Sequence, residues 1–213
     1  MIRIENVSKR FGDTEILKNF SLNVPKGAVY GLMGLNGAGK TTVIKHLAGF
    51  IEPDEGIITI DDQPVIDNEE LKSRVLIIPD ELYFFNSYSL KDMKRYYQKI
   101  YKGWNEERFE EMMKDFSLDI NKNLMKFCLA LSATPDYLIL DEPIDGLDPI
   151  VRRKLWRYIM GDVAEREMTV LISSHNAREM EDVCNYIGII AGGRMIFEGD
   201  LLDTIAGLEP DIA

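Results

Sequence analysis

A glycine-rich loop that ends in lysine and threonine constrains this chain more than any other feature. The loop reads Gly34-Leu35-Asn36-Gly37-Ala38-Gly39-Lys40-Thr41 and fits the pattern G-x-x-x-x-G-K-[ST]. The apolar run 28–33 before it is typical of a buried strand, and residues 40–48 after it are typical of a helix. A chance match in a chain of this composition is expected at a rate of about one in a hundred. The strand–loop–helix context therefore predicts a phosphate-binding loop.

The residue types in this loop suit a polyphosphate site. Glycines let successive backbone N–H groups turn toward anionic oxygens, and the N-terminus of a helix adds a favourable dipole. Lys40 is predicted to neutralise β- and γ-phosphate charge, and the Thr41 hydroxyl to bind Mg²⁺. The predicted nucleotide-binding residues of the loop are Gly34, Leu35, Asn36, Gly37, Ala38, Gly39, Lys40, Thr41 and Thr42.

A second apolar strand, 137–140, ends in two carboxylates, Asp141 and Glu142. Open α/β sheets bind ligands at the carboxyl ends of their strands, so Asp141 is predicted to hold Mg²⁺. Because the chain alternates or turns here, Glu142 points elsewhere and is predicted to act as general base on the attacking water. The alternative is a solvated acidic turn, which the phosphate loop upstream disfavours.

One of the 2 histidines, His175, follows the apolar strand 169–173. A lone histidine is usually structural or exposed, but a position just beyond a sheet strand favours contact with the γ-phosphate. His175 therefore joins Lys40 and Glu142 as a predicted catalytic residue. The other histidine, His46, lies in the helix after the phosphate loop and is interpreted as a packing or surface residue.

Strands and helices alternate along the chain, which predicts a mainly parallel, helix-covered sheet. The early strands, 2–7 and 16–24, have no helix between them and are expected to form a separate antiparallel layer. Residues 89–116 have a helical pattern, with Ser89 and Asn105 as predicted N-caps. Asp148 followed by Pro149 predicts the start of another helix, which is expected to end at about Met160.

Length, charge and cysteine content restrict which class of protein this chain is and which partners it binds. The 213 residues suit one domain, or one core with a small subdomain. A net charge of −11 disfavours a nucleic-acid partner, which requires a basic surface. The 2 cysteines have no paired spacing and are interpreted as buried thiols in a reducing compartment. Neither a secretory signal nor an apolar run of about 18 residues is visible, so membrane association is expected to run through a partner.

Four segments together resemble the ATP-binding cassette (ABC) ATPases. Residues 34–42 resemble the family's Walker A loop, and residues 138–143 its Walker B strand with the catalytic glutamate. Residues 146–149 resemble its D-loop, and residues 173–175 its H-switch. Phe11, before Gly12, matches the aromatic residue that stacks on adenine in this family, and its alternative role is ordinary strand packing. Residues 194–199 resemble the family's final hairpin.

The resemblance implies an α/β fold with a RecA-like phosphate-loop NTPase core, an antiparallel β layer and a helical subdomain. Residues 1–213 are expected to form a single ABC ATPase domain, in which 1–88 and 132–213 form the core with the β layer and 89–131 form the helical subdomain. The implied ligands are ATP and Mg²⁺, and the implied function is ATP hydrolysis that powers transport.

The same resemblance implies partners and a location. The implied partners are a transmembrane permease subunit and a second ATPase subunit, in a homodimer or a heterodimer, and no nucleic acid is expected. The implied location is cytoplasmic, peripheral on the inner face of the cell membrane through the permease. Within the family, the sequence resembles bacterial exporter-type or drug-resistance-type subunits more than it resembles importer subunits.

The first departure from the family pattern is at Asp80, which aligns with a glutamine of the family. Its shorter carboxylate is predicted to reach Mg²⁺, and the open question is whether it does so directly or through water. The aromatic residues that follow are interpreted either as lining a groove for a helix of the membrane partner or as core of the helical subdomain. These aromatic residues are Tyr83, Phe84, Phe85 and Tyr88.

The second departure is the absence of the family's serine- and glycine-rich signature loop, since no glycine occurs between Gly103 and Gly146. In the family this loop contacts the γ-phosphate held by the opposite subunit, so its loss affects the partner's site rather than the site of Lys40 and Glu142. Three explanations are open. Either the sequence omits a loop that the protein contains, or the loop has been deleted, or the chain is the naturally degenerate subunit of an asymmetric heterodimer. The mass of the intact protein separates the first from the others.

Three functions are compatible with these features. A transporter motor subunit is favoured by the set of motifs in a chain with no room for extra domains. A soluble ABC ATPase of the kind that acts on ribosomes, DNA repair or iron–sulfur assembly usually has tandem cassettes, a long coiled coil or a basic surface, and none is visible. A nucleotide-binding subunit with impaired catalysis is supported only by the missing signature.

Overall fold

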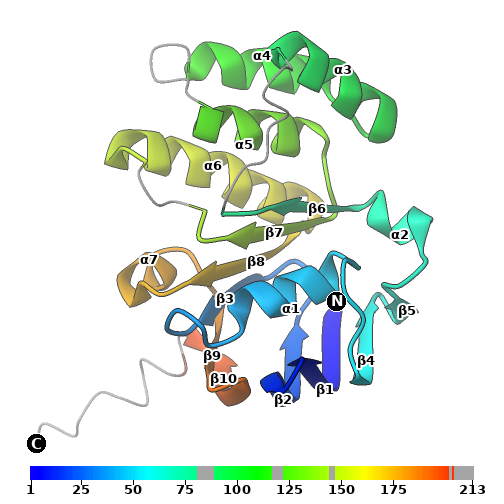
Figure 1. Cartoon of the computed structure of the whole chain (residues 1–213). Coiled ribbons are helices and arrows are strands. Elements are labelled where there is room, and N and C mark those ends of the chain that lie inside the picture. The colour runs from blue at the N-terminus through cyan, green and yellow to red at the C-terminus, as the bar shows by residue number, and fades with distance from the viewer. Residues whose placement is uncertain (81–88, 117–121, 144–146, 202, 204–213) are drawn as a thin grey trace, which may run out of the picture.

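The computed structural model describes residues 1–80, 89–116, 122–143, 147–201 and 203. Two β-sheets lie in separate layers, and helices cover the larger sheet on both faces (Figure 1). Within the described ranges, no helix is both long and apolar enough to cross a bilayer.

The larger sheet has 6 strands in the order β10-β9-β3-β8-β7-β6. All neighbouring strands are parallel except the edge pair β9 and β10. Every residue of β7 and β8 is buried, as expected for strands that helices or another sheet cover on both faces. The strands are β3 (Val29–Met33), β6 (Val75–Ile78), β7 (Tyr137–Asp141), β8 (Thr169–Ser174), β9 (Tyr186–Ala191) and β10 (Arg194–Asp200).

The smaller sheet is antiparallel and has the order β2-β1-β4-β5. Its strands are β1 (Ile2–Phe11), β2 (Thr14–Val24), β4 (Glu55–Ile60) and the two-residue β5 (Gln63–Pro64). Ile2 and Ile4 of β1 are buried and point to the core, as the alternation of apolar and polar residues predicted. The expected antiparallel layer of early strands is therefore confirmed.

Helices divide the interior into two apolar cores. Helix α1 (Lys40–Leu47) lies between the two sheets, where Val43 and Leu47 pack against residues of both. On the other face of the large sheet, α5 (Lys122–Ser132) and α6 (Pro149–Arg166) pack on the strands, and α3 (Leu90–Ile100) and α4 (Glu106–Asp115) lie beyond α5 (Figure 1). The short helices α2 (Glu69–Lys72) and α7 (Ala177–Glu181) complete the fold.

The predicted helix starts are confirmed and one predicted helix end is wrong. Ser89 forms a capping box with Asp92, and Asn105 and Asp148 accept hydrogen bonds from the first turns of α4 and α6. Helix α6 continues beyond Met160 to Arg166, and Glu167 ends it in the left-handed conformation with φ 55°. The expected α/β fold class is confirmed, whereas the subdomain boundaries at 88/89 and 131/132 stay a prediction.

The buried His46 generates a prediction about acid stability. Its side chain is 1% exposed, and Nδ1 donates to the Ile51 carbonyl at 3.0 Å because a carbonyl can only accept. Nε2 is then an acceptor, and among the described residues it has no hydrogen-bond partner. Burial lowers the pKa of His46 below its ordinary value.

The unfolded chain therefore binds a proton at His46 as the pH falls through about 6.5, and the folded chain resists it, so folding stability falls with the pH. His46→Asn keeps a donor for the Ile51 carbonyl and removes the titrating group. Thermal unfolding at about pH 7.5 and about pH 5.5 is expected to show a smaller drop in Tm for this variant than for the wild type. Equal drops would contradict this account of His46.

Candidate functional site

The parallel sheet brings its functional residues to one edge. Strands β3, β8, β7 and β6 are neighbours in that order. At or just beyond their carboxyl ends lie the phosphate loop, His175, Asp141 with Glu142, and Asp80, respectively. The phosphate loop is tied to the neighbouring strand because the Gly34 N–H donates to the Ser174 carbonyl at 3.3 Å. Four segments distant in sequence therefore meet at one sheet edge, as ligand sites of open α/β sheets do.

Two glycines of the phosphate loop are required by its geometry. Gly39 is the N-cap of α1 and has φ 116°, which residues with a side chain rarely adopt. Gly34 lies so close to β9 that a Cβ atom would be 2.5 Å from the Ile190 carbonyl oxygen. These two positions let the chain pass from β3 into α1 in a tight loop.

Lys40 lies inside the site rather than in solvent, with 6% exposure. Its Nζ donates to the Gly34 carbonyl at 2.7 Å and to the Leu35 carbonyl at 3.4 Å. The same Nζ lies 3.2 Å from Glu142 Oε1. The ammonium group is therefore held between the phosphate loop and the acidic end of β7.

Glu142 adopts an unusual backbone conformation. Its φ of 44° lies in the left-handed region, which costs a residue with a side chain of the order of 1 kcal/mol. Ser173 stabilises this turn, because the Glu142 N–H lies 3.2 Å from both the carbonyl and the Oγ of Ser173. The turn directs the carboxylate toward Lys40 and also toward His175, whose Nδ1 is 3.0 Å from Oε2.

Asp141, the last residue of β7, is fixed by the neighbouring strand. Its side chain is 4% exposed, and the Ser173 hydroxyl donates to Oδ1 at 2.5 Å. Ser173 lies directly opposite Asp141 in the parallel register of β7 and β8. One serine thus positions both acidic residues of the site.

A cavity of about 420 Å³ joins these groups. It is lined by Ile16, Leu35, Asn36, Gly37, Gly39, Lys40, Thr41, Thr42, Asp80, Asp141 and Glu142. A second cavity, of about 440 Å³, lies against the other side of the loop and is lined by Gly34, Ala38 and His175 among others. The first cavity thus brings the predicted phosphate-loop residues, except Gly34 and Ala38, together with the three predicted metal-binding residues.

The oxygen donors of the first cavity fit a magnesium ion. Thr41, Asp80 and Asp141 supply a hydroxyl and two carboxylates, which are the hard oxygen ligands that Mg²⁺ prefers. Glu142 Oε1 is buried and, among the described residues, accepts no well-aligned hydrogen bond in addition to its ion pair with Lys40. No group of three His, Cys, Asp or Glu side chains within the described ranges is arranged as a metal cage by itself.

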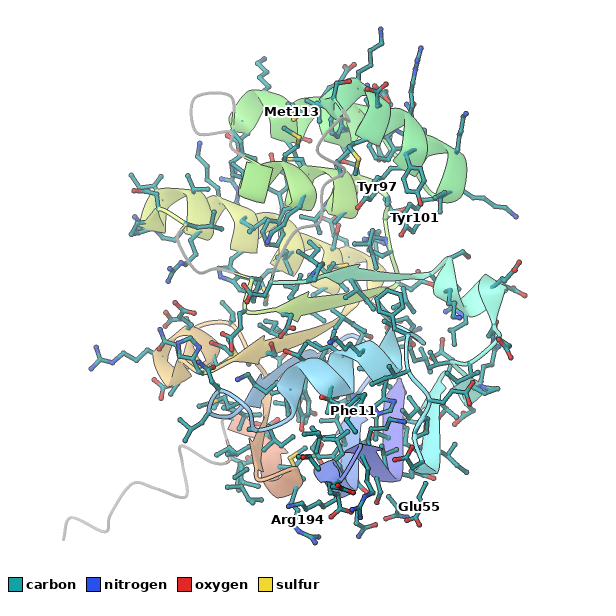
Figure 2. The ribbon with its side chains drawn as sticks, viewed as in Figure 1. Phe11, Glu55, Tyr97, Tyr101, Met113 and Arg194 are labelled. Carbon is teal, nitrogen blue, oxygen red and sulfur yellow. The ribbon has the colours of Figure 1, made fainter. Side chains whose placement is uncertain are left out.

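Phe11 lies at the end of β1, in the antiparallel layer (Figure 2). Phe11 is 48% exposed and lines neither of the two cavities, whereas Ile16 from the next strand lines the first. Lys9 Nζ lies 5.7 Å from the ring centroid. Stacking of Phe11 on an adenine stays a prediction.

The sequence analysis did not predict a role for Ser173, although this residue lies just before His175 in the sequence. Ser173 lies near the end of β8, two residues before His175, and the parallel pairing with β7 that places it beside Asp141 is a tertiary property. The aromatic residues Tyr83, Phe84, Phe85 and Tyr88 lie outside the described residues. The same holds for residues 117–121, which precede α5 where the signature loop was expected.

Sequence comparison identifies the family. The family model described as ABC transporter matches residues 17–145. Lantibiotic transport ATP-binding protein SrtF of Streptococcus pyogenes is 34% identical over 211 residues, which is 93% of this chain and 90% of the relative. ABC transporter ATP-binding protein YtrB of Bacillus subtilis is 29% identical over 200 residues, which is 89% of this chain and 68% of the relative.

Structural comparison agrees. A solved ATP-binding subunit of an ABC transporter superposes with a TM-score of 0.87 at 26% identity, covering 98% of this chain and 94% of that one. A bacterial Atm1-family ABC exporter with ATP bound has a TM-score of 0.83 at 22% identity, covers 97% of this chain and 39% of that one, and supports the fold alone. The chain belongs to the ABC transporter family.

Proposed function

We propose that this protein binds ATP with Mg²⁺ and hydrolyses it to power transport by a membrane-embedded permease. The observation that carries the proposal is that Lys40, Asp141 and Glu142 line one cavity at the end of a parallel sheet. Membership of a family of ATP-binding transporter subunits supports ATP hydrolysis. The coupling of hydrolysis to a permease is inferred from relatives that are named as transport or export ATP-binding proteins.

In this proposal the site divides the chemistry among its residues. Backbone N–H groups at the start of α1 and the Lys40 ammonium bind the β- and γ-phosphates. Thr41 and Asp141 would hold Mg²⁺, with Asp80 beside them, and the ion neutralises charge on the phosphates when bound. Glu142 takes the proton from a water whose oxygen forms a bond to the γ-phosphorus, while the bond from that phosphorus to the β–γ bridging oxygen breaks.

His175 is proposed to orient Glu142. Its Nδ1 lies 3.0 Å from Oε2, so a protonated Nδ1 holds the carboxylate in place and leaves the other ring nitrogen free to face the nucleotide. Lys40 Nζ lies 3.2 Å from Glu142 Oε1. The terminal phosphates of the nucleotide compete with Glu142 for this ammonium group. Phosphate binding would thus release Glu142 to act on water.

A surface groove supports docking of the permease. A cavity of about 290 Å³ is lined mainly by apolar residues of α1, α2 and β6 and includes the exposed Phe50. Tyr101, at the end of α3, contributes to its wall and lies beside Tyr97 (Figure 2). Relatives are named for lantibiotic transport and for Nod factor export, which favours an exporter that acts at the inner face of the membrane.

The missing signature loop favours a second candidate. A chain without that loop would complete its partner's site poorly, while its own site could be completed by a subunit that carries the loop. An asymmetric heterodimer with a second ATPase subunit accommodates this arrangement, as does a nucleotide-binding subunit with impaired catalysis. A soluble non-transport ABC ATPase has no specific feature of this structure in its favour.

Glu142→Gln tests the general base. Glutamine keeps the shape of the side chain but cannot accept the proton, so turnover is expected to fall by at least about 100-fold. ATP affinity is expected to be retained or increased, because the competing ion pair with Lys40 is lost. Steady-state hydrolysis and equilibrium ATP binding by the complete transporter check both. The exposed Glu181→Gln is the matched control, and a Glu142→Gln enzyme with wild-type turnover would contradict the assignment.

Ser173→Ala tests the positioning of the two acids. Removal of the hydroxyl leaves buried Asp141 Oδ1 without this donor, which is expected to cost about 1–3 kcal/mol of folding stability and to lower turnover. Ser174→Ala is the control, because the Ser174 hydroxyl accepts from the Asn176 N–H rather than contacting the acids. Denaturant unfolding and ATPase rates are the measurements. Equal effects of both variants would argue against a special role for Ser173.

A further inference from the structure

Gly192 and Gly193 form the turn that joins β9 to β10, and the sequence motifs of the site do not include it. Strand β10 lies beside β2 of the antiparallel layer (Figure 1). Ile190 and Ala191, which precede the turn, line the second cavity together with Ala38 of the phosphate loop. The turn therefore lies close to both β2 and the phosphate loop.

Gly193 is hydrogen-bonded to both of these neighbours. Its N–H donates to the Ala38 carbonyl at 3.2 Å, and its own carbonyl accepts from the Lys18 N–H at 2.9 Å. Ala38 belongs to the phosphate loop and Lys18 to β2. Through its backbone, Gly193 thus ties the phosphate loop to the antiparallel layer.

Only glycine fits at this position. Gly193 has φ 79°, and a Cβ atom there would lie 2.1 Å from the Ile16 carbonyl oxygen, far inside contact distance. Gly192 also has a positive φ, of 53°, but a Cβ atom there would meet no atom within 4 Å beyond its chain neighbours. The two glycines therefore share a backbone preference and differ in their surroundings.

The hydrogen bond to Ala38 determines the direction of the next N–H group. The peptide unit between Ala38 and Gly39 is trans and planar, so its C=O and its N–H point in opposite directions. Because the carbonyl faces Gly193, the Gly39 N–H points to the opposite side of the loop. The cavity linings agree, since Gly39 lines the first cavity beside Lys40 and Ala38 lines the second.

The Gly39 N–H is available to a ligand in this orientation. Among the described residues, none accepts a hydrogen bond from it. Gly39 is the N-cap of α1, where backbone N–H groups and the helix dipole favour an anion. A reversed peptide would instead present the Ala38 carbonyl oxygen to the cavity, and that oxygen would repel a phosphate.

We propose that Gly193 is a positioning residue of the phosphate loop, whose N–H holds the Ala38–Gly39 peptide so that the Gly39 N–H faces the β- and γ-phosphates. The inference rests on the proposed function, since it concerns the same nucleotide site. It assigns to the turn between β9 and β10 a contribution to ATP binding that requires no contact between Gly193 and the nucleotide.

The first test compares Gly193→Ala with Gly192→Ala in equilibrium MgATP titrations of the full chain. Both variants place a methyl group on a residue with positive φ, so they share the cost of that conformation. Only Gly193→Ala forces the turn away from Ile16 and from the phosphate loop, and it is expected to weaken binding by about tenfold or more. Gly192→Ala is the matched control, with wild-type affinity expected.

The second test removes the donor without adding a side chain. Replacement of Gly193 by glycolic acid turns the peptide N–H into an ester oxygen and keeps the carbonyl that accepts from Lys18. This ester variant is expected to weaken MgATP binding by about tenfold, and it decides the question if Gly193→Ala does not fold. The same ester at position 192 is the control, because the Gly192 N–H donates to none of the described residues.

An amide chemical-shift titration separates positioning from a general loss of stability. MgATP is expected to shift the Gly39 amide in the wild type and to shift it much less in the Gly193 ester variant. The Thr42 amide lies inside α1 and is expected to keep its shift in both. A merely structural role of Gly193 would lower the Tm and leave the Gly39 shift of the folded protein unchanged.

Three results would overturn the inference: wild-type affinity in the Gly193 ester variant, equal weakening by the changes at position 192, or an unchanged Gly39 shift in the Gly193 ester variant. The wild-type titration decides the proposed function separately. Failure of the wild type to bind MgATP would overturn both, whereas normal wild-type binding with an indifferent Gly193 ester variant would overturn the inference alone.

Discussion

The order of strands in the parallel sheet is the constraint on which the whole site depends. Parallel strands end at a common edge, and the sequence β3-β8-β7-β6 brings the phosphate loop, His175, the two acids of β7 and Asp80 to adjacent strand ends. The hydrogen-bonded register fixes these strands relative to one another, so the positions of the chemical groups follow from backbone pairing. Both apolar cores then hold the sheet rigid from its two faces.

At that edge of the sheet, several acidic side chains lie close to few positively charged ones. Lys40 is shared between loop carbonyls and Glu142, while Ser173 donates to Asp141 and supports the left-handed turn of Glu142. The Ser173 contacts fix Asp141 and the backbone of Glu142 before the nucleotide binds. Groups that are fixed in advance need little reorganisation when charge develops on the phosphates.

Much of the fold could be predicted from the sequence, because its signals are local. The phosphate loop, the capping box at Ser89 and the Asp148-Pro149 helix start depend on residues that are neighbours in the chain. The left-handed Glu142, the pairing of Ser173 with Asp141 and the burial of Lys126 depend on strands and helices that meet only in the folded molecule. Helix α6 extends past the predicted end at about Met160 because tertiary packing outweighs the helix-weakening effect of Gly161.

The central claim is that the strand-end cavity holds the terminal phosphates of ATP. An amide chemical-shift titration of the isotopically labelled chain with MgATP tests it most directly. We expect saturable shifts of the Gly37, Gly39, Lys40 and Thr41 amides, together with those of Asp141 and Glu142 on the neighbouring strand. Saturable binding with shifts confined to surfaces away from the phosphate loop, or no shift at all, would contradict the account.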